Sequence, residues 1–171
     1  EVDTPPEMMC VNGNALDLRV NGKADLATIH DFDEDLTASG TVTADGAIRG
    51  DFSKPQLNGR MQFENAAFSI VDFPNGISKA SGSVLFNGDR ATIQKFTGET
   101  GGGTIELSGF ATYGAGAPVF RLHAEANQVR VRYPEGVSTV ADARLNLSGT
   151  VDRSVLSGTI TVLRTGFNPQ S

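Results

Sequence analysis

Apolar and polar side chains alternate with a period of two along most of the chain after Ala15. Leu16, Leu18 and Val20 alternate with polar neighbours, and the same pattern returns around Phe120 and Leu145. No segment longer than about ten residues has the 3.6-residue period of a helix. The alternation predicts an all-β chain, made of roughly a dozen short strands.

Glycine recurs in this alternation at one constant phase. Residues two apart share a face of a strand, so Gly59 points to the same side as Leu57 and Met61, and Gly158 to the same side as Ile160. One interpretation is a bend or bulge that curls the sheet. The other is space kept open above the sheet for an apolar molecule. Both interpretations predict a sheet curved around its apolar side.

Turn dipeptides separate the alternating segments. We expect hairpin turns at five Asn-Gly or Asp-Gly pairs, which begin at Asn12, Asn21, Asp45, Asn75 and Asn87. Residues 1–14 are predicted to form an extended lead-in without regular structure. Residues 15–171 are predicted to form a single β-rich segment of a longer protein, whose targeting segment lies elsewhere.

Composition excludes several classes of protein. The formal charge of −6 disfavours nucleic acid as a partner, and no apolar run is long enough for a membrane-spanning helix. The single cysteine, Cys10, forms no intrachain disulfide. Six arginines supply most of the positive charge of the second half, and we interpret them as parts of solvated outer faces: Arg121, Arg130, Arg132, Arg144, Arg153 and Arg164.

Candidates for catalysis or metal binding are weak. Asp31, Asp33 and Asp35 have the spacing that begins a calcium loop, but Leu36 stands where an EF-hand needs glycine. The two histidines have no cysteine near them in the sequence, and no Ser/His/Asp arrangement stands out. We therefore expect no enzyme activity, no metal and no cofactor.

The order of several short motifs resembles the TamB and AsmA-like family of envelope proteins. Pro55–Gly59 resembles the recurring P-x-L-x-G signature of this family, and Phe86–Arg90, followed by Gly98 and Gly101–Gly103, resembles its F-x-G-D-R…G-x-x-G-G-G stretch. Val131–Gly136 and Leu156–Gln170 are also similar to it. The resemblance covers about residues 50–170.

The resemblance implies an architecture and a function. It implies an internal segment, before the family's C-terminal domain, of a periplasmic protein with an inner-membrane anchor outside this sequence. The fold implied is an elongated, curved β-sheet that forms an open half-pipe (a β-taco) with an apolar concave face. The function implied is phospholipid transport between the inner and outer membranes and outer-membrane biogenesis, with an Omp85-type, TamA-like barrel as partner.

Three functions remain open. The first is a hydrophobic groove for phospholipid acyl chains, the second a chaperone-like groove that holds strands of outer-membrane protein clients, and the third a structural β-solenoid of an adhesin. The inward-facing residues that would line a lipid or client groove are Leu57, Met61, Phe63, Val84, Phe86, Ile105, Leu107, Phe120, Leu122, Leu145, Leu147, Ile160 and Val162.

Overall fold

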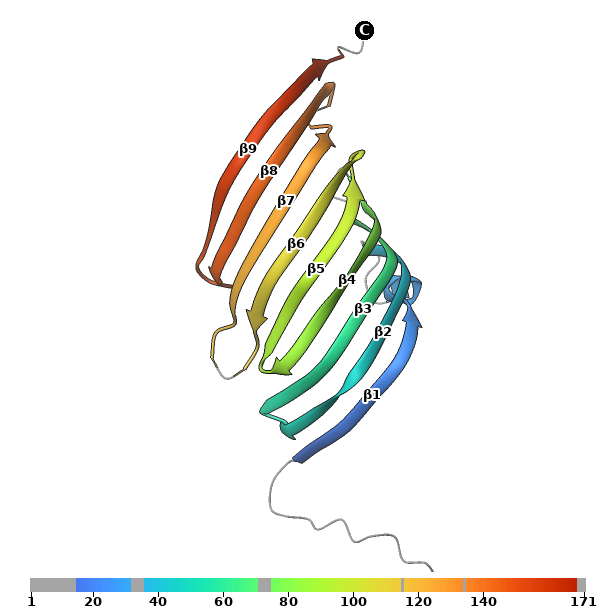
Figure 1. The fold of residues 1–171 in the computed structure, drawn as a ribbon, viewed down its shortest axis with the longest axis vertical. Helices are drawn as coiled ribbons and strands as arrows, with labels where there is room; N and C mark the ends of the chain where they lie inside the picture. Colours follow the sequence, from blue (N-terminus) through green and yellow to red (C-terminus); the bar gives the residue numbers. More distant parts are fainter. Residues whose placement is uncertain (1–14, 32–35, 71–74, 115, 134, 169–171) are drawn as a thin grey trace, which may run out of the picture.

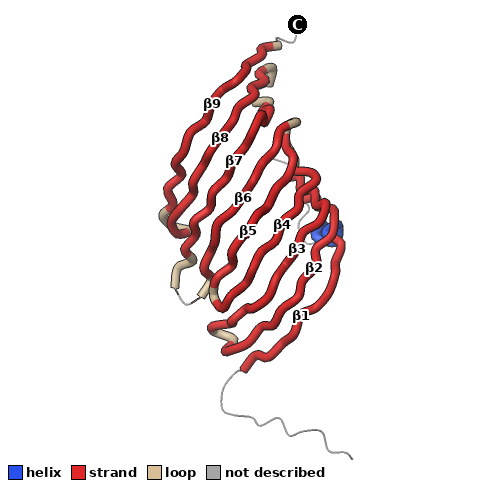
Figure 2. The backbone as a smooth tube through the Cα atoms, viewed as in Figure 1, coloured by secondary structure: helices blue, strands red, loops and turns tan. Residues whose placement is uncertain are grey.

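The computed structural model describes residues 15–31, 36–70, 75–114, 116–133 and 135–168. These residues form one nine-stranded antiparallel sheet in which every strand pairs with its neighbours in sequence, and a single short 3₁₀ helix (Figures 1 and 2). The elements are β1 (Ala15–Asp25), η1 (Leu26–Asp31), β2 (Leu36–Asp51), β3 (Lys54–Ile70), β4 (Ile77–Gly88), β5 (Arg90–Thr100), β6 (Gly103–Thr112), β7 (Val119–Val131), β8 (Val137–Thr150) and β9 (Ser154–Phe167).

The all-β prediction is confirmed, but the strands are fewer and longer than expected. Asn21-Gly22 lies inside β1 and Asp45-Gly46 lies inside β2, so neither pair makes a hairpin turn. Asn87-Gly88 does end β4, where Gly88 has a φ of 69°. The Asn12-Gly13 pair lies outside the described residues. The alternation of apolar and polar residues continues through Asn21-Gly22 and Asp45-Gly46. Both pairs remain in strands because cross-strand pairing satisfies their backbone hydrogen-bonding groups.

The phase of the glycines is explained by their cross-strand neighbours. Phe63 of β3 and Phe96 of β5 both lie opposite Gly82 of β4. Their rings meet edge to face with centroids 6.0 Å apart. A Cβ atom on Gly82 would lie 2.9 Å from a ring carbon of Phe96. Glycine at this position therefore makes room for large side chains from the two adjacent strands.

Bulges interrupt the ladder at one end of β2, β3 and β4. The register shifts beside Gly40, Asn65 and Lys79, all of which have positive φ. A bulge bends its strand and increases the local twist. In Figure 1 the ribbon curves where these three strands approach η1.

A small core fills the bend beside η1. Leu26 of η1 packs against three alanines, Ala38, Ala66 and Ala80, and these four are the buried apolar residues among those described. Small side chains allow the bulged strands to approach the helix closely. The remainder of the sheet has its apolar side chains partly exposed.

Both edges of the sheet are open within the described residues. β1 and β9 each pair on one side only, so the sheet is not closed into a barrel. All 14 residues of β9 are exposed, including Leu156, Ile160 and Val162. The described residues contain no helix long and apolar enough to cross a bilayer. The predicted lead-in, residues 1–14, lies outside the described part of the chain.

Candidate functional site

One face of the sheet carries a continuous apolar surface across all nine strands. Residues directly opposite each other in an antiparallel ladder point to the same side. The register therefore links one member of each strand in a single row, which we call the central row: Gly22, Ala44, Met61, Val84, Ile93, Gly109, Leu122, Leu147 and Leu156. The row contains no polar side chain. We call the side to which it points the apolar face.

The structure brings all thirteen predicted groove residues to the apolar face. Met61, Val84, Leu122 and Leu147 belong to the central row itself, and the others lie in the rows beside it. Eleven of the thirteen are partly buried by their neighbours, whereas Ile160 and Val162 on the edge strand are 64% and 59% exposed. The predicted residues thus share one surface of the sheet.

Several residues of this face were missed by the sequence reasoning. Ile93 and Phe96 are three residues apart, so they do not alternate, yet a bulge in β5 places both on the apolar face opposite Gly109 and Leu107. Val20 belongs to the recognisable alternation of β1, but nothing in its own segment shows that it lies beside the predicted groove.

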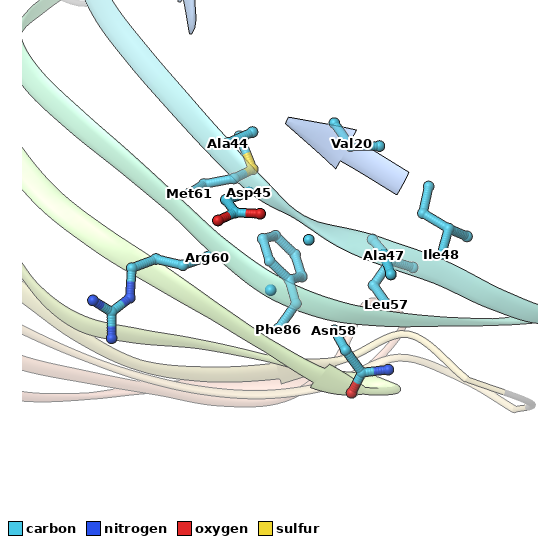
Figure 3. Close-up of a pocket in the computed structure, with 12 residues that line it drawn as sticks. Val20, Ala44, Asp45, Ala47, Ile48, Leu57, Asn58, Arg60, Met61 and Phe86 are labelled. Atoms are coloured by element: carbon cyan, nitrogen blue, oxygen red, sulfur yellow. The ribbon is translucent and has the colours of Figure 1, made fainter. Parts of the chain in front are cut away.

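The apolar face has a pocket where two glycines lie opposite each other. Gly46 of β2 pairs with Gly59 of β3, and Val20 and Phe86 follow them on either side in the same row. The missing side chains leave an apolar pocket of about 170 Å³. Figure 3 shows Phe86 and Met61 beside this pocket, with Arg60 extending away from it. An engineered apolar cavity of about 150 Å³ accepts a benzene molecule, so this pocket is large enough for a short piece of hydrocarbon.

Neither glycine of the pair tolerates a side chain. A Cβ atom on Gly46 would lie 2.6 Å from the carbonyl oxygen of Asn58. A Cβ atom on Gly59 would collide with the carbonyl oxygen of Asp45, and the φ of Gly59 is +157°. Glycine is therefore required by the close approach of the two strands, and the pocket follows from that requirement.

The opposite face, which we call the polar face, carries charged side chains in complementary cross-strand pairs. Arg49 lies 3.3 Å from Asp17, Lys95 lies 3.2 Å from Glu106, and other pairs join Lys79 to Glu99 and Arg144 to Glu125. Exposed pairs of this kind contribute little to stability. They give the two faces of the sheet opposite chemical character.

His123 lies in the middle of the polar face between two oxygen acceptors. Its Nδ1 is 2.8 Å from Oδ1 of Asn146, and its Nε2 is 3.3 Å from Oε1 of Glu125. Both contacts favour the doubly protonated ring, which donates from both nitrogens. The hydrogen bond to Asn146, followed by the one to Glu125, therefore raises the pKa of His123 above its ordinary value.

We expect the stability of the wild-type chain to fall as the pH rises through this raised pKa. The folded pKa lies above the unfolded one, so the stabilisation is complete below about pH 6.5 and is lost at higher pH. The substitution His123→Gln should flatten this part of the pH dependence. Thermal unfolding of both chains between about pH 5.5 and about pH 8 measures it. Identical pH profiles for the two chains would contradict the assignment.

Metal-ligating side chains do not gather on the described part of the sheet. Groups of three or more His, Cys, Asp or Glu residues with metal-site geometry are absent there. Asp33 and Asp35 of the acidic segment lie outside the described residues, so the structure does not test that segment.

Comparison with known families identifies the second half of the sheet. Residues 94–169, from the middle of β5 to the end of β9, match the family model of the TamB C-terminal domain. This part of the chain is TamB-like. No curated protein and no solved structure matches the chain.

The match refines the place of this TamB-like segment within the family. The motifs place it before the C-terminal domain, whereas the matched model is that of the C-terminal domain itself. A TamB domain indicates an envelope protein with a role in envelope biogenesis or in lipid or protein transport. The family is a non-enzymatic transport and assembly module, and it is associated with an outer-membrane partner.

Proposed function

We propose that the apolar face of this TamB-like chain is a groove that receives phospholipid acyl chains. The chain is then one segment of a periplasmic conduit that moves phospholipids between the inner and outer membranes and so supports outer-membrane biogenesis. The observation that carries the proposal is the central row, which continues across nine strands without a polar side chain. Removing apolar surface from water contributes about 0.8 kcal/mol for each methylene group buried.

The proposal includes a half-pipe, with the apolar face on the inside. The bulges at Gly40, Asn65 and Lys79 support it, since bulges bend and twist a sheet. Another bulge follows at Gln128 in β7, which also has positive φ. Bulges on several strands give an antiparallel sheet the means to curve along its length.

Hydrocarbon suits the apolar face better than a peptide does. The backbone groups under the Gly46–Gly59 pair already belong to the β2–β3 ladder. A peptide lying over this face would therefore bring amide groups that find no partner, at a cost of several kcal/mol for each buried group. An alkyl chain brings no such groups, and a trough that binds it needs no specific polar residue.

A chaperone-like groove for outer-membrane clients is the second candidate, and the edge strand β9 favours it. This strand presents 14 residues with one unpaired side in the described structure. An exposed edge of this length is a template for an added strand. Under either candidate the full-length protein acts with an Omp85-type, TamA-like barrel and is anchored in the inner membrane by a segment outside this sequence.

A closed adhesin solenoid receives less support. It requires a filled core, whereas buried apolar residues in the described part of the chain are confined to the four beside η1. The open meander of nine strands also differs from a coil of repeated turns.

Photo-crosslinking tests the proposed groove. A photoreactive residue at Phe63, Phe86 or Leu122, in the protein expressed in its own cells, should give phospholipid adducts. Phe110 provides the matched control, because it is also a phenylalanine but lies on the polar face, with the guanidinium of Arg90 4.0 Å from its ring centroid. We expect adducts at Phe110 to be fewer by about tenfold, as its face offers an alkyl chain no continuous apolar surface.

The results separate the candidates. Adducts with outer-membrane proteins alone at Phe63, Phe86 and Leu122 would favour the chaperone-like groove. Equal lipid labelling at Phe86 and Phe110 would indicate contact with any exposed aromatic residue and would refute the groove. Absence of all adducts would also refute it.

A further inference from the structure

Three arginines gather at one end of the sheet, and none of them forms an ion pair with a carboxylate of the described residues. Arg130 of β7 and Arg164 of β9 both lie opposite Val140 of β8, and Arg132 follows Arg130 two residues later. Val140 lies on the same side of β8 as Arg144, so this row belongs to the polar face. We call Arg130, Arg132 and Arg164 the arginine cluster.

The cluster concentrates positive charge on one part of the polar face, because Arg130 and Arg164 lie opposite the same residue. In the described residues, none of the close ion pairs includes Arg130, Arg132 or Arg164. The nearest acidic group along β8, Asp142, accepts a hydrogen bond of 2.7 Å from the backbone N–H of Gln128. Glu135 lies in the connection that follows the cluster. Like charges in one cross-strand row repel each other, which an anion would relieve.

The backbone around the cluster is held in place by contacts between distant segments. The N–H of Arg130 donates to the carbonyl oxygen of Gly101 at 3.0 Å, and the side-chain amide of Asn75 donates to the carbonyl oxygen of Arg130 at 2.6 Å. Gly101 and Gly102 have φ values of 55° and 76°, the pattern of a tight hairpin turn. These contacts fix Arg130 at the point where three segments of the chain meet.

Two pockets adjoin Arg130, and their linings suit an anion. One, of about 330 Å³, is lined by Arg130, Arg164 and Gln128 together with the Gly101–Gly102 turn. The other, of about 270 Å³, is lined by Arg130, Arg132 and Asn75 beside the same turn. No carboxylate lines either pocket within the described residues. Added space is available at the turn, because a Cβ atom on Gly102 would meet nothing within 4 Å.

We propose that the arginine cluster binds a phosphate group. The planar guanidinium presents paired N–H donors that match the oxygens of a phosphate, and several arginines together bind it more strongly than one. The apolar neighbours Val140 and Leu163 in the wall of the larger pocket suit a phosphate that is joined to an alkyl chain. The site lies on the polar face and therefore stands apart from the groove of the proposed function.

NMR titration of the purified chain tests the site. The probes are inorganic phosphate and dihexanoylphosphatidylglycerol below its micelle concentration, and the readout is the side-chain Nε–Hε resonances of the arginines. We expect saturable shifts at the cluster, and R130Q/R164Q should weaken binding by about tenfold or more, since each hydrogen bond to a charged group is lost. The control R121Q/R144Q removes the same charge from the same face and should change the affinity by less than about twofold.

Each outcome decides the proposal. Binding of inorganic phosphate as tight as that of the lipid supports a site for a free anion, and tighter binding of the lipid supports a headgroup site. Absence of saturable shifts with both probes overturns the proposal. Equal weakening by the two double variants also overturns it, because that result reports net charge alone. Lipid crosslinking at Phe86 in R130Q/R164Q should stay unchanged, which separates this site from the groove.

Discussion

Replacing Gly109 with valine should destabilise the sheet by about 3–5 kcal/mol. Gly109 lies in the central row on β6 with a φ of +136°, a conformation that residues with a side chain rarely adopt. A Cβ atom there would collide with the carbonyl oxygen of Arg121 and lie 2.8 Å from the Cα of Leu122. Backbone strain and steric overlap with a neighbouring strand therefore act together. Denaturant unfolding followed by circular dichroism measures the loss.

Two other glycines separate the contributions. Gly22→Val, on the same face of β1, meets no atom within 4 Å and has no positive φ, so it should change stability by less than about 1 kcal/mol. Gly102→Val meets no atom either but has a φ of +76°, and it should show the cost of strain alone, about 1–3 kcal/mol. A loss for Gly109→Val no larger than that for Gly22→Val would refute the steric argument.

A glutamate in place of Leu122 should interrupt the proposed groove at its seventh strand. Leu122 lies in the central row between Gly109 and Leu147. An ionised carboxylate there would force an acyl chain to pass a charge that stays hydrated, and passage should fall by about tenfold or more. The readout is phospholipid crosslinking at Phe63 on one side of the substitution and at Leu156 on the other.

The side that loses its adducts reports the direction of lipid movement. Loss at Phe63 indicates entry from the β9 end, and loss at Leu156 indicates entry from the β1 end. Ser148→Glu is the control, since Ser148 lies on the polar face opposite Arg121 and adds the same charge. Unchanged labelling on both sides of Leu122→Glu, in a chain whose thermal unfolding shows it to be folded, would contradict passage along this face.

The faces of the strands could be predicted from the sequence because their period is two. The phase of Leu57, Met61 and Phe63 is visible in their own segment, and the structure places them together. Alternation also predicted β-structure in the residues before about 50, which the family resemblance does not cover. A local pattern is sufficient to assign a face whenever no bulge intervenes.

The strand ends and the pocket could not be predicted in this way. Asp45-Gly46 has the composition of a hairpin turn, but its pairing with Gly59 and Arg60 keeps it inside a strand. Cross-strand register also decides that Gly46 meets Gly59, and no single segment contains that information. Phe96 was missed because the bulge after Ile93 breaks the alternation.

The arginine cluster was hidden for a related reason. Arg130 and Arg164 are far apart in sequence, and each lies next to a bulge that shifts the register of its strand. Interpreted singly, each is an ordinary solvated arginine. Their position opposite the same residue, Val140, depends on both shifts together.

In this meander topology the extent of the sheet across its strands changes in fixed steps. Nine strands at about 4.8 Å spacing cover about 38 Å from β1 to β9. One hairpin contributes two strands, so adding or deleting it changes this span by about 9.6 Å. The next strand then starts at the same end of the sheet and runs in the same direction as before. The rows of the remaining strands stay in register, because each strand pairs with its sequence neighbours. A protein built on this plan can match the distance between two membranes by the number of its hairpins.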